Sequence, residues 1–555
     1  MNKIVLIFLS VLVGQSSWGQ QWGDYTLYSV QNSSSATLLD TNGTAYHTWT
    51  FASNKKTGYS SYLLPGGNII RSIANSGNQL NGGGMTGAIQ TCDWNGNVVW
   101  DFVYSSSSYC LHHDFCPLPN GNVLLISYDV KSAADITAAG SSIAHSMWLE
   151  KIIEVHPTGA STGDIVWEWH VYDHLCQSVN ANGGNYVSST LEHPELFNIN
   201  YQNTAQTQDW MHMNGIDYNP EFDQIVFSSH MLNEIYVIDH STSTAEAASH
   251  SGGNSGKGGD LLYRWGNPAT YGGTGSATLN VVHDGHFIPA GCPNAGFIVG
   301  FNNNGVSNST SCIDMVDTPA NGYGFDITPG ATLLPSTYTY RQNCTGHTSN
   351  MGNSEQLPNG NMLICIAMSG LIYEIDPSGN TIWSKSVSGT VPQAHRYTAC
   401  YVAGTTPAAP TVSQNGSVLN SSAGGGYQWY LNGAPIAGAT AQSYTPTVSG
   451  DYQVAIVEAG SCTSELSNAI NVVMTNMSEF EVTRDWSIYP NPVQDVLNLV
   501  GANNFNYTIV NATGQRVMQG NQSNRIDVSM LESGLYTIVM KDNQGNVEVK
   551  KMIKK

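Results

Sequence analysis

The stretches LPNGNVLLI (118–126) and LPNGNMLIC (357–365) decide the fold, together with the related LLPGGNII (63–70). Each combines the end of one strand, a tight turn containing Asn-Gly or Gly-Gly, and the start of a second strand. A tryptophan-bearing strand follows each of them, in CDWNGNVVWDF (92–102), IEVHPTGASTGDIVWEWH (153–170) and YEIDPSGNTIWS (373–384). A β unit that recurs in this way indicates a repeat architecture.

Two further units fit the same pattern with divergent turns. They are IDYNPEFDQIVFSSHMLNEIYVIDHS (216–241), followed by LLYRWGN, and HFIPAGCPNAGFIVGFNNNG (286–305). A last first-strand, HRYTACYVAG (395–404), has its missing partners at the other end of the chain, within residues 26–51. We therefore predict a six-bladed β-propeller over residues 20–404, in which one blade is completed by both ends of the domain.

Composition supports an all-β fold and restricts the partners. The 555-residue chain is long enough for several domains, carries only 11% charged residues and is rich in glycine, with a net charge of −21. This acidity argues against nucleic acids and anionic lipid surfaces as partners. An anionic substrate would need a local site of hydrogen-bond donors.

The N-terminus and the cysteines indicate export. Residues 1–19 have a lysine, an apolar run and small residues before an expected cleavage site after Gly19, which is typical of a signal peptide, and no membrane span is expected elsewhere. Ten cysteines fit an oxidising compartment as structural disulfides or inert core thiols. Their connectivity stays open, although several lie close in sequence: Cys110 and Cys116, Cys292 and Cys312, Cys344 and Cys365.

A Pro/Ala/Thr-rich linker at 404–412 precedes two smaller modules. Residues 409–475, with Trp429 and the segment SGDYQV, resemble the Ig-like β-sandwiches of bacterial surface proteins, although Val454 stands where antibody domains have their second cysteine. Residues 486–555, with SIYPNPVQDVLNL and ESGLYTIVMKD, resemble the C-terminal sorting domain of type IX secretion in Bacteroidetes. This resemblance implies a small C-terminal β-sandwich, the type IX secretion machinery as a partner, and a secreted or cell-surface location.

Histidines recur at one register of the repeat. The first strand of a propeller blade is the innermost, so a common register places these side chains at one axial cavity. The positions are His112, six residues before Leu118; His212, six before Tyr218; His283, within one residue of the same place; His395, six before Tyr401; and, in the fifth unit, Met351 with His347 four residues upstream. Such a ring could consist of packed strand histidines, bind a transition metal, or bind and transfer an anionic group.

A family resemblance favours the last of these. DWMHMNGIDYNPEFDQIVFSSHMLNEIYVID (209–239), LYRWGN, the H-D-G-H unit followed by FNNNG, and LPNGNMLI resemble segments of bacterial aryl-sulfate sulfotransferases over residues 40–400. The resemblance implies a six-bladed propeller that needs no 3′-phosphoadenosine cofactor. It also implies transfer of sulfate from a phenolic sulfate donor to a phenol acceptor through a sulfated histidine.

The resemblance also implies roles for individual residues. The candidate catalytic residues are His347 (first choice as nucleophile), His395 (second choice), His212 (sulfate-binding or acid–base) and His283; the candidate substrate-binding residues are His112, His113, Asn214 and Asn304. The family's arginine is missing from FNNNGVSNST, where Asn303 also replaces an aspartate. Arg264 and Arg341 are the candidates to replace that arginine in space.

Three functions remain open at this point. The leading one is an exported arylsulfotransferase-like enzyme without cofactor or metal. The second is a non-catalytic surface propeller that binds a glycan or a protein, which the absent arginine and the attached modules favour. The third is a metal-dependent hydrolase or lyase, for which the HHDF segment (112–115) would supply a ligand and a carboxylate.

Overall fold

The computed structural model describes residues 23–201, 208–458, 462–474, 487–500, 505–511, 516–521, 524–542 and 547–555. The predicted signal peptide lies outside these residues. The chain forms two compact units, Met1–Val473 and Met474–Lys555. The all-β prediction is confirmed, because strands dominate both units and the few helices are short.

Six four-stranded antiparallel sheets follow one another between residues 25 and 397. We number them as blades in chain order, with the closing blade last. Blade 1 contains β4 (Thr57–Leu63), β5 (Ile69–Ala74), β6 (Gly87–Cys92) and β7 (Val98–Val103); blade 2 contains β8 (Tyr109–Pro117), β9 (Val123–Lys131), β10 (Met147–Gly159) and β11 (Thr162–His170). Blade 3 contains β14 (Met213–Asn219), β15 (Gln224–Ser229), β16 (Glu234–Asp239) and β17 (Tyr263–Trp265); blade 4 contains β18 (Val282–Phe287), β19 (Ile298–Ser307), β20 (Thr310–Val316) and β23 (Tyr340–Asn343). Blade 5 contains β24 (Asn353–Gln356), β25 (Met362–Ile366), β26 (Leu371–Ile375) and β27 (Thr381–Ser386); the closing blade contains β28 (Ala394–Tyr397), β1 (Tyr25–Ser29), β2 (Ser35–Leu39) and β3 (Ala45–Thr50).

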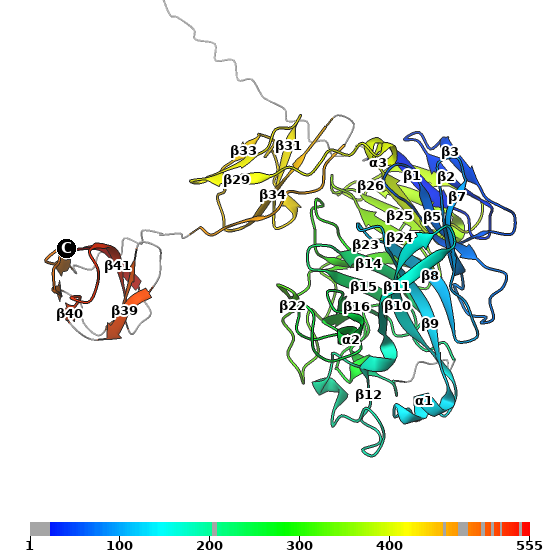
Figure 1. The fold of residues 1–555 in the computed structure, drawn as a ribbon, viewed down its shortest axis with the longest axis horizontal. Helices are drawn as coiled ribbons and strands as arrows, with labels where there is room; N and C mark the ends of the chain where they lie inside the picture. Colours follow the sequence, from blue (N-terminus) through cyan, green and yellow to red (C-terminus); the bar gives the residue numbers. More distant parts are fainter. Residues whose placement is uncertain are drawn as a thin grey trace, which may run out of the picture. The chain divides into compact units, whose positions relative to one another are not determined.

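The two ends of this region share one sheet, as the sequence predicts. Strand β28 pairs with β1 in antiparallel register, with His395 opposite Leu27. Yellow-green strands from the end of the region accordingly lie beside the blue β1 and β2 (Figure 1). The innermost strands of successive blades contact one another from β4 through β8, β14, β18 and β24 to β28, and β1 contacts β4. This closed ring of strands is the β-propeller arrangement.

The innermost strands of blades 2, 3 and 4 have an irregularity that matters for the site. Their pairing registers shift between Leu111 and Phe115 in β8, at Met213–Gly215 in β14 and between His283 and His286 in β18. A β-bulge of this kind bends a strand and redirects side chains, and it often lies next to an active site. The backbone is left-handed at His113, His212, Asp284 and Met351, with φ between 49° and 59°.

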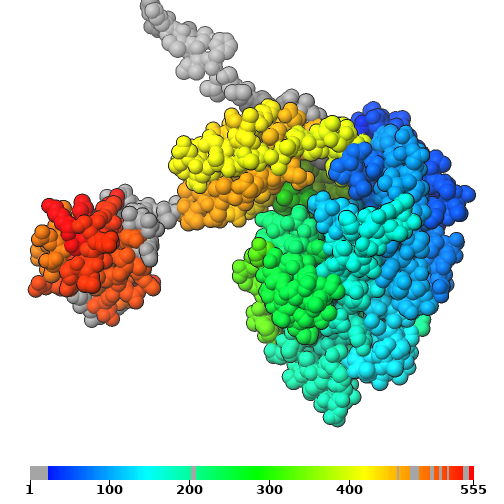
Figure 2. Space-filling model, in the orientation of Figure 1, coloured from blue at the N-terminus to red at the C-terminus, as the bar shows by residue number. Residues whose placement is uncertain are grey.

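Buried apolar side chains fill the space between blades. One core cluster joins blades 2 and 3 through Leu124, Ile152, Trp169, Phe227 and Tyr236. Figure 2 shows the cyan and green surfaces of this part of the chain lying side by side. The blades therefore form a rigid support for the ends of the inner strands.

Short elements connect or flank the blades. They are α1 (Ala133–Ala138), η1 (Val171–His174), β12 (Leu175–Cys176), η2 (Thr190–Glu192), β13 (Phe197–Asn198), α2 (Thr244–Ala247), η3 (Pro268–Tyr271), β21 (Ala320–Asn321), β22 (Gly324–Phe325), η4 (Ala367–Ser369) and α3 (Ala399–Ala403). Among the residues that the structure describes, no helix has the length and apolar character needed to cross a membrane.

Two facing sheets form the module after the linker. One contains β29 (Val412–Asn415), β30 (Val418–Ser421) and β33 (Ser443–Tyr444), and the other contains β32 (Ala434–Pro435), β31 (Tyr427–Leu431), β34 (Gly450–Ile456) and β35 (Ile470–Val472). Trp429 is fully buried between them, and the hydroxyl of Tyr452 donates to the carbonyl of Val448. A buried tryptophan and a tyrosine bonded to the upstream backbone are features of Ig-like sandwiches.

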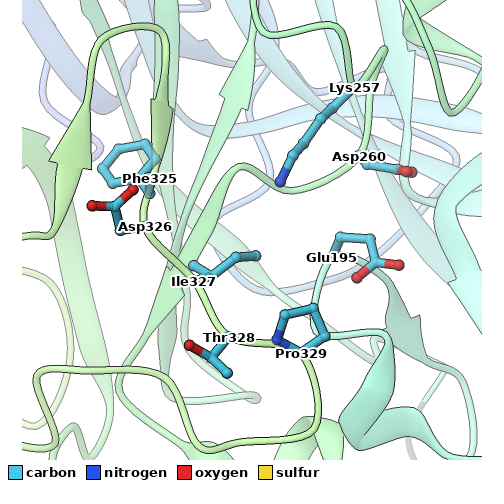
Figure 3. A pocket seen from close by; sticks show the side chains of 8 residues that line it. All are labelled: Glu195, Lys257, Asp260, Phe325, Asp326, Ile327, Thr328 and Pro329. Atoms are coloured by element: carbon cyan, nitrogen blue, oxygen red, sulfur yellow. The ribbon is translucent and has the colours of Figure 1, made fainter. Parts of the chain in front are cut away.

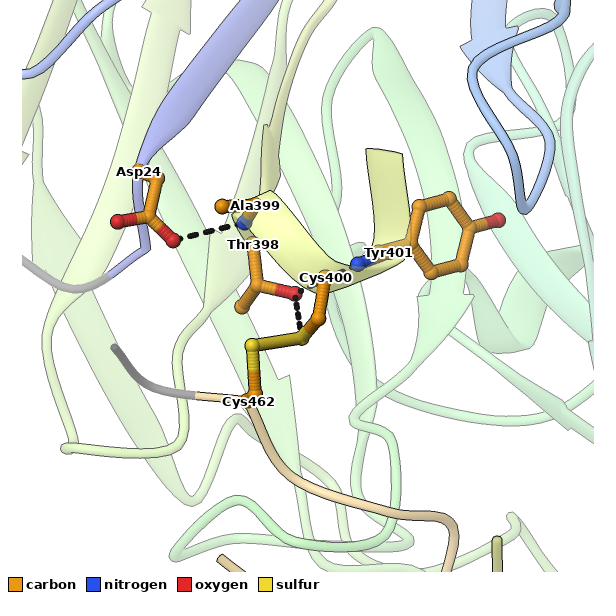
Figure 4. Close-up of a disulfide and its surroundings, with 6 residues drawn as sticks. All are labelled: Asp24, Thr398, Ala399, Cys400, Tyr401 and Cys462. Atoms are coloured by element: carbon orange, nitrogen blue, oxygen red, sulfur yellow. Dashed lines mark hydrogen bonds between the residues drawn. A yellow bond between two sulfur atoms is a disulfide. The ribbon is translucent and has the colours of Figure 1, made fainter. Parts of the chain in front are cut away.

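A disulfide joins Cys400 in α3 to Cys462 (Figure 4). Helix α3 is held at its start, where Asp24 accepts from the amide of Ala399 and the Thr398 hydroxyl accepts from the amide of Tyr401. The bond therefore ties the Ig-like module to the closing blade. The other eight cysteines are free thiols, seven of them buried, so the pairs that are close in sequence do not form disulfides.

Removing this disulfide should destabilise the Ig-like module. Because the bond closes a loop with a sequence separation of 62 residues, Cys462→Ser is expected to lower the free energy of unfolding by about 2–4 kcal/mol. Denaturant unfolding followed by tryptophan fluorescence would measure it. A reductant should destabilise the native protein to the same extent and leave the Cys400→Ser/Cys462→Ser variant unchanged; an equal effect on both would contradict the assignment.

The C-terminal unit is a second small sandwich. Its sheets contain β36 (Ser487–Tyr489), β37 (Val496–Val500) and β40 (Arg525–Asp527), and β39 (Arg516–Asn521), β38 (Phe505–Asn511), β41 (Gly534–Asp542) and β42 (Val547–Lys554). Leu497, Ile509, Ile538 and Met552 form its fully buried core.

Candidate functional site

A row of histidine rings lies along the inner strands of blades 2, 3 and 4, together with His230, which follows β15 of blade 3. The rings of His113 and His212 are 4.6 Å apart, those of His212 and His230 are 5.2 Å apart, and those of His230 and His283 are 5.5 Å apart. His112 joins the row through His113, because their Nδ1 atoms are 2.9 Å apart. We call these five residues the histidine cluster.

Asp209 controls the charge of His212. The Nδ1–H of His212 donates to the Asp209 carboxylate at 2.5 Å, and the Tyr128 hydroxyl lies 3.0 Å from the same oxygen. Burial lowers the pKa of His212, but the hydrogen bond and negative charge of Asp209, with the charge of Glu150, outweigh it and raise the pKa above the ordinary value. His212 is therefore the member of the cluster that favours the imidazolium form.

The other four histidines favour the neutral form. Burial, together with the charge on His212, lowers the pKa of His112 to about 3 and that of His230 to about 4. Burial and neighbouring imidazoles hold the pKa values of His113 and His283 well below the ordinary range. The cluster thus combines one ring that favours the imidazolium form with four that favour the neutral form.

Asn303 fixes the tautomer of His283. Its amide nitrogen donates to the carbonyls of Thr348 and Met351, both at 2.8 Å, so its oxygen must face His283. That oxygen accepts from Nδ1–H of His283 at 2.7 Å. In the neutral imidazole the lone pair is then on Nε2, the atom that can act as a nucleophile.

His112 faces away from the row, into its own blade. Its Nε2 lies 2.7 Å from a Glu150 carboxylate oxygen, and the other oxygen accepts from the amide of Met213. The left-handed residue of β8 is His113, not His112. The sequence register places His112 at the axial position, and the bulge in β8 gives that position to His113 instead.

Two glycines of blade 1 make room for the cluster. A Cβ atom at Gly83 would lie 2.5 Å from Cε1 of His212, and one at Gly84 would clash with three ring atoms of His113. Tyr59, on β4 of the same blade, has its ring 5.1 Å from that of His113. Its buried hydroxyl has no hydrogen-bond partner within the described part of the chain, which leaves a donor next to the cluster.

Gly84→Ala should displace His113 and impair the site. Gly121→Ala is the matched control, because Gly121 also has a positive φ (88°, against 62° at Gly84) but no atom within 4 Å of the added Cβ. Both variants bear a similar backbone strain of roughly 1–2 kcal/mol. We expect only Gly84→Ala to lower ligand binding or turnover more than tenfold; an equal loss in both would contradict the location of the site.

The remaining predicted residues make their hydrogen bonds to partners outside the cluster. His347 hydrogen-bonds through Nε2 to Asn304, the neighbour of Asn303 in β19. His395 instead bonds to Glu355 and packs on Tyr62, and its Nε2 has no partner among the described residues. Asn214 is fully buried and bridges the Val282 carbonyl and the Ser228 hydroxyl, which ties β14 to β18.

Neither candidate arginine hydrogen-bonds to the cluster in the described structure. Arg264 is fully buried and bonds to Glu234, Thr270 and the carbonyls of Pro194 and Leu196. Arg341 bonds to Asp314 and to the carbonyl of Gly305. Both guanidinium groups are engaged within the blades.

Sequence reasoning missed five contributors: Glu150, Asp209, His230, Tyr59 and Asn303 as a positioning residue. Asp209 could have been identified from the sequence, because it lies three residues before His212 in the segment that begins DWMHMN. His230 follows β15 outside the repeated register, so the repeat could not identify it.

Two surface pockets lie elsewhere, one around Glu195, Lys257 and Asp260 (Figure 3) and one around Arg264 and Arg341.

A cationic imidazole next to neutral ones can bind an oxyanion and provide a nucleophile and an acid at one place. The fold and the site thus define a β-propeller with a histidine cluster at its inner strands. The comparisons agree with this class: the chain belongs to the arylsulfotransferase family, whose model matches residues 21–391. The secretion system C-terminal sorting domain matches residues 487–555, which indicates export to the cell surface or secretion.

Other comparisons are distant. A comparison with curated proteins gives no significant match. A Bacteroides caccae protein of unknown function is 11% identical, with 67% of this chain and 98% of that chain covered and a TM-score of 0.38. The periplasmic gluconolactonase of Pseudomonas aeruginosa is 9% identical, with 81% and 96% covered and a TM-score of 0.35, and AztD of Citrobacter koseri is 9% identical, with 67% and 98% covered and a TM-score of 0.32. At these values the likenesses do not bear on function.

Proposed function

We propose that this exported protein transfers a sulfuryl group from a phenolic sulfate ester to an acceptor phenol through a sulfated histidine. The observation that carries the proposal is the pairing of His212, which Asp209 holds toward the imidazolium form, with the neutral imidazole of His283, whose tautomer Asn303 fixes. Family membership supports the reaction type. The natural partners would be a small phenolic donor and acceptor, and the sorting domain would engage the type IX secretion machinery.

His283 is the proposed nucleophile. Its Nε2 lone pair attacks sulfur, the bond between sulfur and the phenolic oxygen breaks, and the electron pair leaves with the phenolate. His212 gives that oxygen a proton from its imidazolium form. In the second half-reaction an acceptor phenol loses its proton to His212, attacks the sulfur and releases His283. Two imidazoles with opposite protonation suit these two roles.

The cationic ring of His212 would also take the place of the family's arginine. Negative charge on the sulfuryl oxygens needs positioned donors in a site shielded from water. His212 supplies a charge, and the hydroxyl of Tyr59 supplies a further donor near His113. His347, which bonds to Asn304, would assist His283, whereas His395 is held by Glu355 and Tyr62.

One assay tests the function. Purified protein is incubated with 4-nitrophenyl sulfate, with and without an acceptor phenol, and nitrophenolate release is followed. We expect acceptor-dependent release, and sulfated acceptor in equal amount. If the native protein releases nothing with a range of phenols, but binds phenols or glycans saturably, the non-catalytic propeller is the correct function.

A further inference from the structure

We propose a binding site for a divalent transition ion, with Zn²⁺ as the best fit, formed by His174, His250 and Asp260. This site is distinct from the histidine cluster and independent of the proposed function. His174 is the last residue of η1, directly after blade 2, while His250 and Asp260 belong to the glycine-rich loop that follows α2. One possible ligand atom of each residue lies within 4.8 Å of the other two.

Both imidazoles converge on a single oxygen. Nδ1 of His174 lies 2.8 Å from Oδ1 of Asp260, and Nδ1 of His250 lies 2.7 Å from the same atom. Two imidazole nitrogens and a carboxylate oxygen are typical zinc ligands, and the neutral imidazole also suits copper and nickel. A fourth position would remain for water, because His250 has 63% of its side chain exposed.

The second nitrogen of His174 shows why a cation fits here. Nε2 lies 2.8 Å from the carbonyl oxygen of Ala247, which can only accept, so Nε2 carries a proton. In the neutral tautomer the Nδ1 lone pair then faces the Asp260 carboxylate, and a cation between them removes the repulsion. A backbone carbonyl that orients the far nitrogen is the usual support of a metal-bound histidine.

Packing and hydrogen bonds hold His174 and the loop around Asp260 in place, whereas the side chain of His250 is exposed and free to adjust. The ring of Trp169 is nearly parallel to that of His174, and its Nε1–H donates to the carbonyl of Gly259, next to Asp260. A tetrahedral zinc ion with bonds of about 2.0–2.1 Å holds its ligand atoms roughly 3.3 Å apart. The contacts need to open by about half an ångström, and the exposed His250 can move.

Asp260 also borders the pocket of Figure 3, with Glu195 and Lys257 on its walls. This pocket has a volume of about 520 Å³. A bound ion would fasten the loop after α2 to blade 2. Since an ion that binds only the folded state stabilises it, loading should raise the unfolding temperature.

Zinc titration of the full exported chain, without an affinity tag and after dialysis against a chelator, tests the site. Calorimetry should show one ion per chain, and His250→Ala should weaken binding more than about 10²-fold. Asp260→Asn should do the same and abolish the zinc-dependent rise in unfolding temperature. His250 is exposed, so its replacement leaves the fold without zinc unchanged.

Two control variants separate this site from other histidines. His212→Ala removes a member of the cluster, and His156→Ala removes an exposed histidine of β10; both should bind zinc as the native protein does. Absence of binding to the native chain would overturn the proposal and leave His174 as a hydrogen-bond partner of Asp260. Binding that survives in His250→Ala and Asp260→Asn but disappears in His212→Ala would overturn it too, by placing the ion in the cluster.

Discussion

Replacing His283 by alanine is expected to lower acceptor-dependent sulfuryl transfer by roughly 10³-fold or more, because the covalent intermediate can no longer form. Asn303 presents the Nε2 lone pair of this residue, and none of the other neutral rings has its tautomer fixed by a side-chain amide of known orientation. The rate of nitrophenolate release under single-turnover conditions measures the effect.

Two further variants distinguish loss of the nucleophile from a folding defect. His283→Gly leaves a cavity that added imidazole can fill, so imidazole should restore part of the donor cleavage. Asn303→Leu keeps the nucleophile but loses the amide that orients it, and the rate should fall by about 10²-fold. His347→Ala is expected to have a smaller effect than His283→Ala; if it alone abolishes turnover, His347 is the nucleophile.

The second large effect concerns Asp209. The hydrogen bond and charge of this carboxylate raise the pKa of His212, so Asp209→Asn removes the group that keeps the ring protonated. Burial then lowers the pKa of His212, and we expect transfer at neutral pH to fall by about 10²–10³-fold. His240→Gln is a suitable control: His240 also bonds to carboxylates, those of Asp223 and Glu154, but it lies outside the cluster.

The directions of the two pKa shifts predict how the transfer rate changes with pH. Activity needs neutral His283, whose pKa lies well below 6.5, and protonated His212, whose pKa lies above 6.5. The rate should therefore rise as pH increases through the low pKa of His283 and fall as it passes the high pKa of His212. In Asp209→Asn the alkaline limb should move to lower pH, and the acid limb should move slightly to higher pH, because the charge of His212 no longer lowers the pKa of His283. An alkaline limb that does not move would contradict the role of His212.

The repeat made most of the propeller predictable. The LPNGN turns mark the connection between the first two strands of blades 2 and 5. The strand predicted at 395–404 pointed to closure with residues 26–51, which the pairing of β28 with β1 confirms. Its second half was wrong, because the strand ends at Tyr397 and helix α3 follows. Local turn chemistry and strand alternation contain this information. The linkage between Cys400 and Cys462 was not predictable, because only packing of the Ig-like module against the closing blade brings the two together.

The site was predictable only in part. His212 and His283 could be found because their motifs are local, whereas His395 shares the spacing but bonds to Glu355. A bulge adds a residue to a strand without a clear mark in the sequence, so the register could not distinguish His112 from His113. Glu150 reaches the cluster from β10, a different strand of the blade, and only the tertiary structure shows that contact.

The most direct test of the central claim is the mass of the intact protein after incubation with 4-nitrophenyl sulfate and no acceptor. We predict that one sulfuryl group is added per chain, that it maps to the peptide containing His283, and that an acceptor phenol removes it. The His283→Ala variant should gain no mass. A native protein that turns over the donor while its mass never changes would contradict the sulfohistidine mechanism.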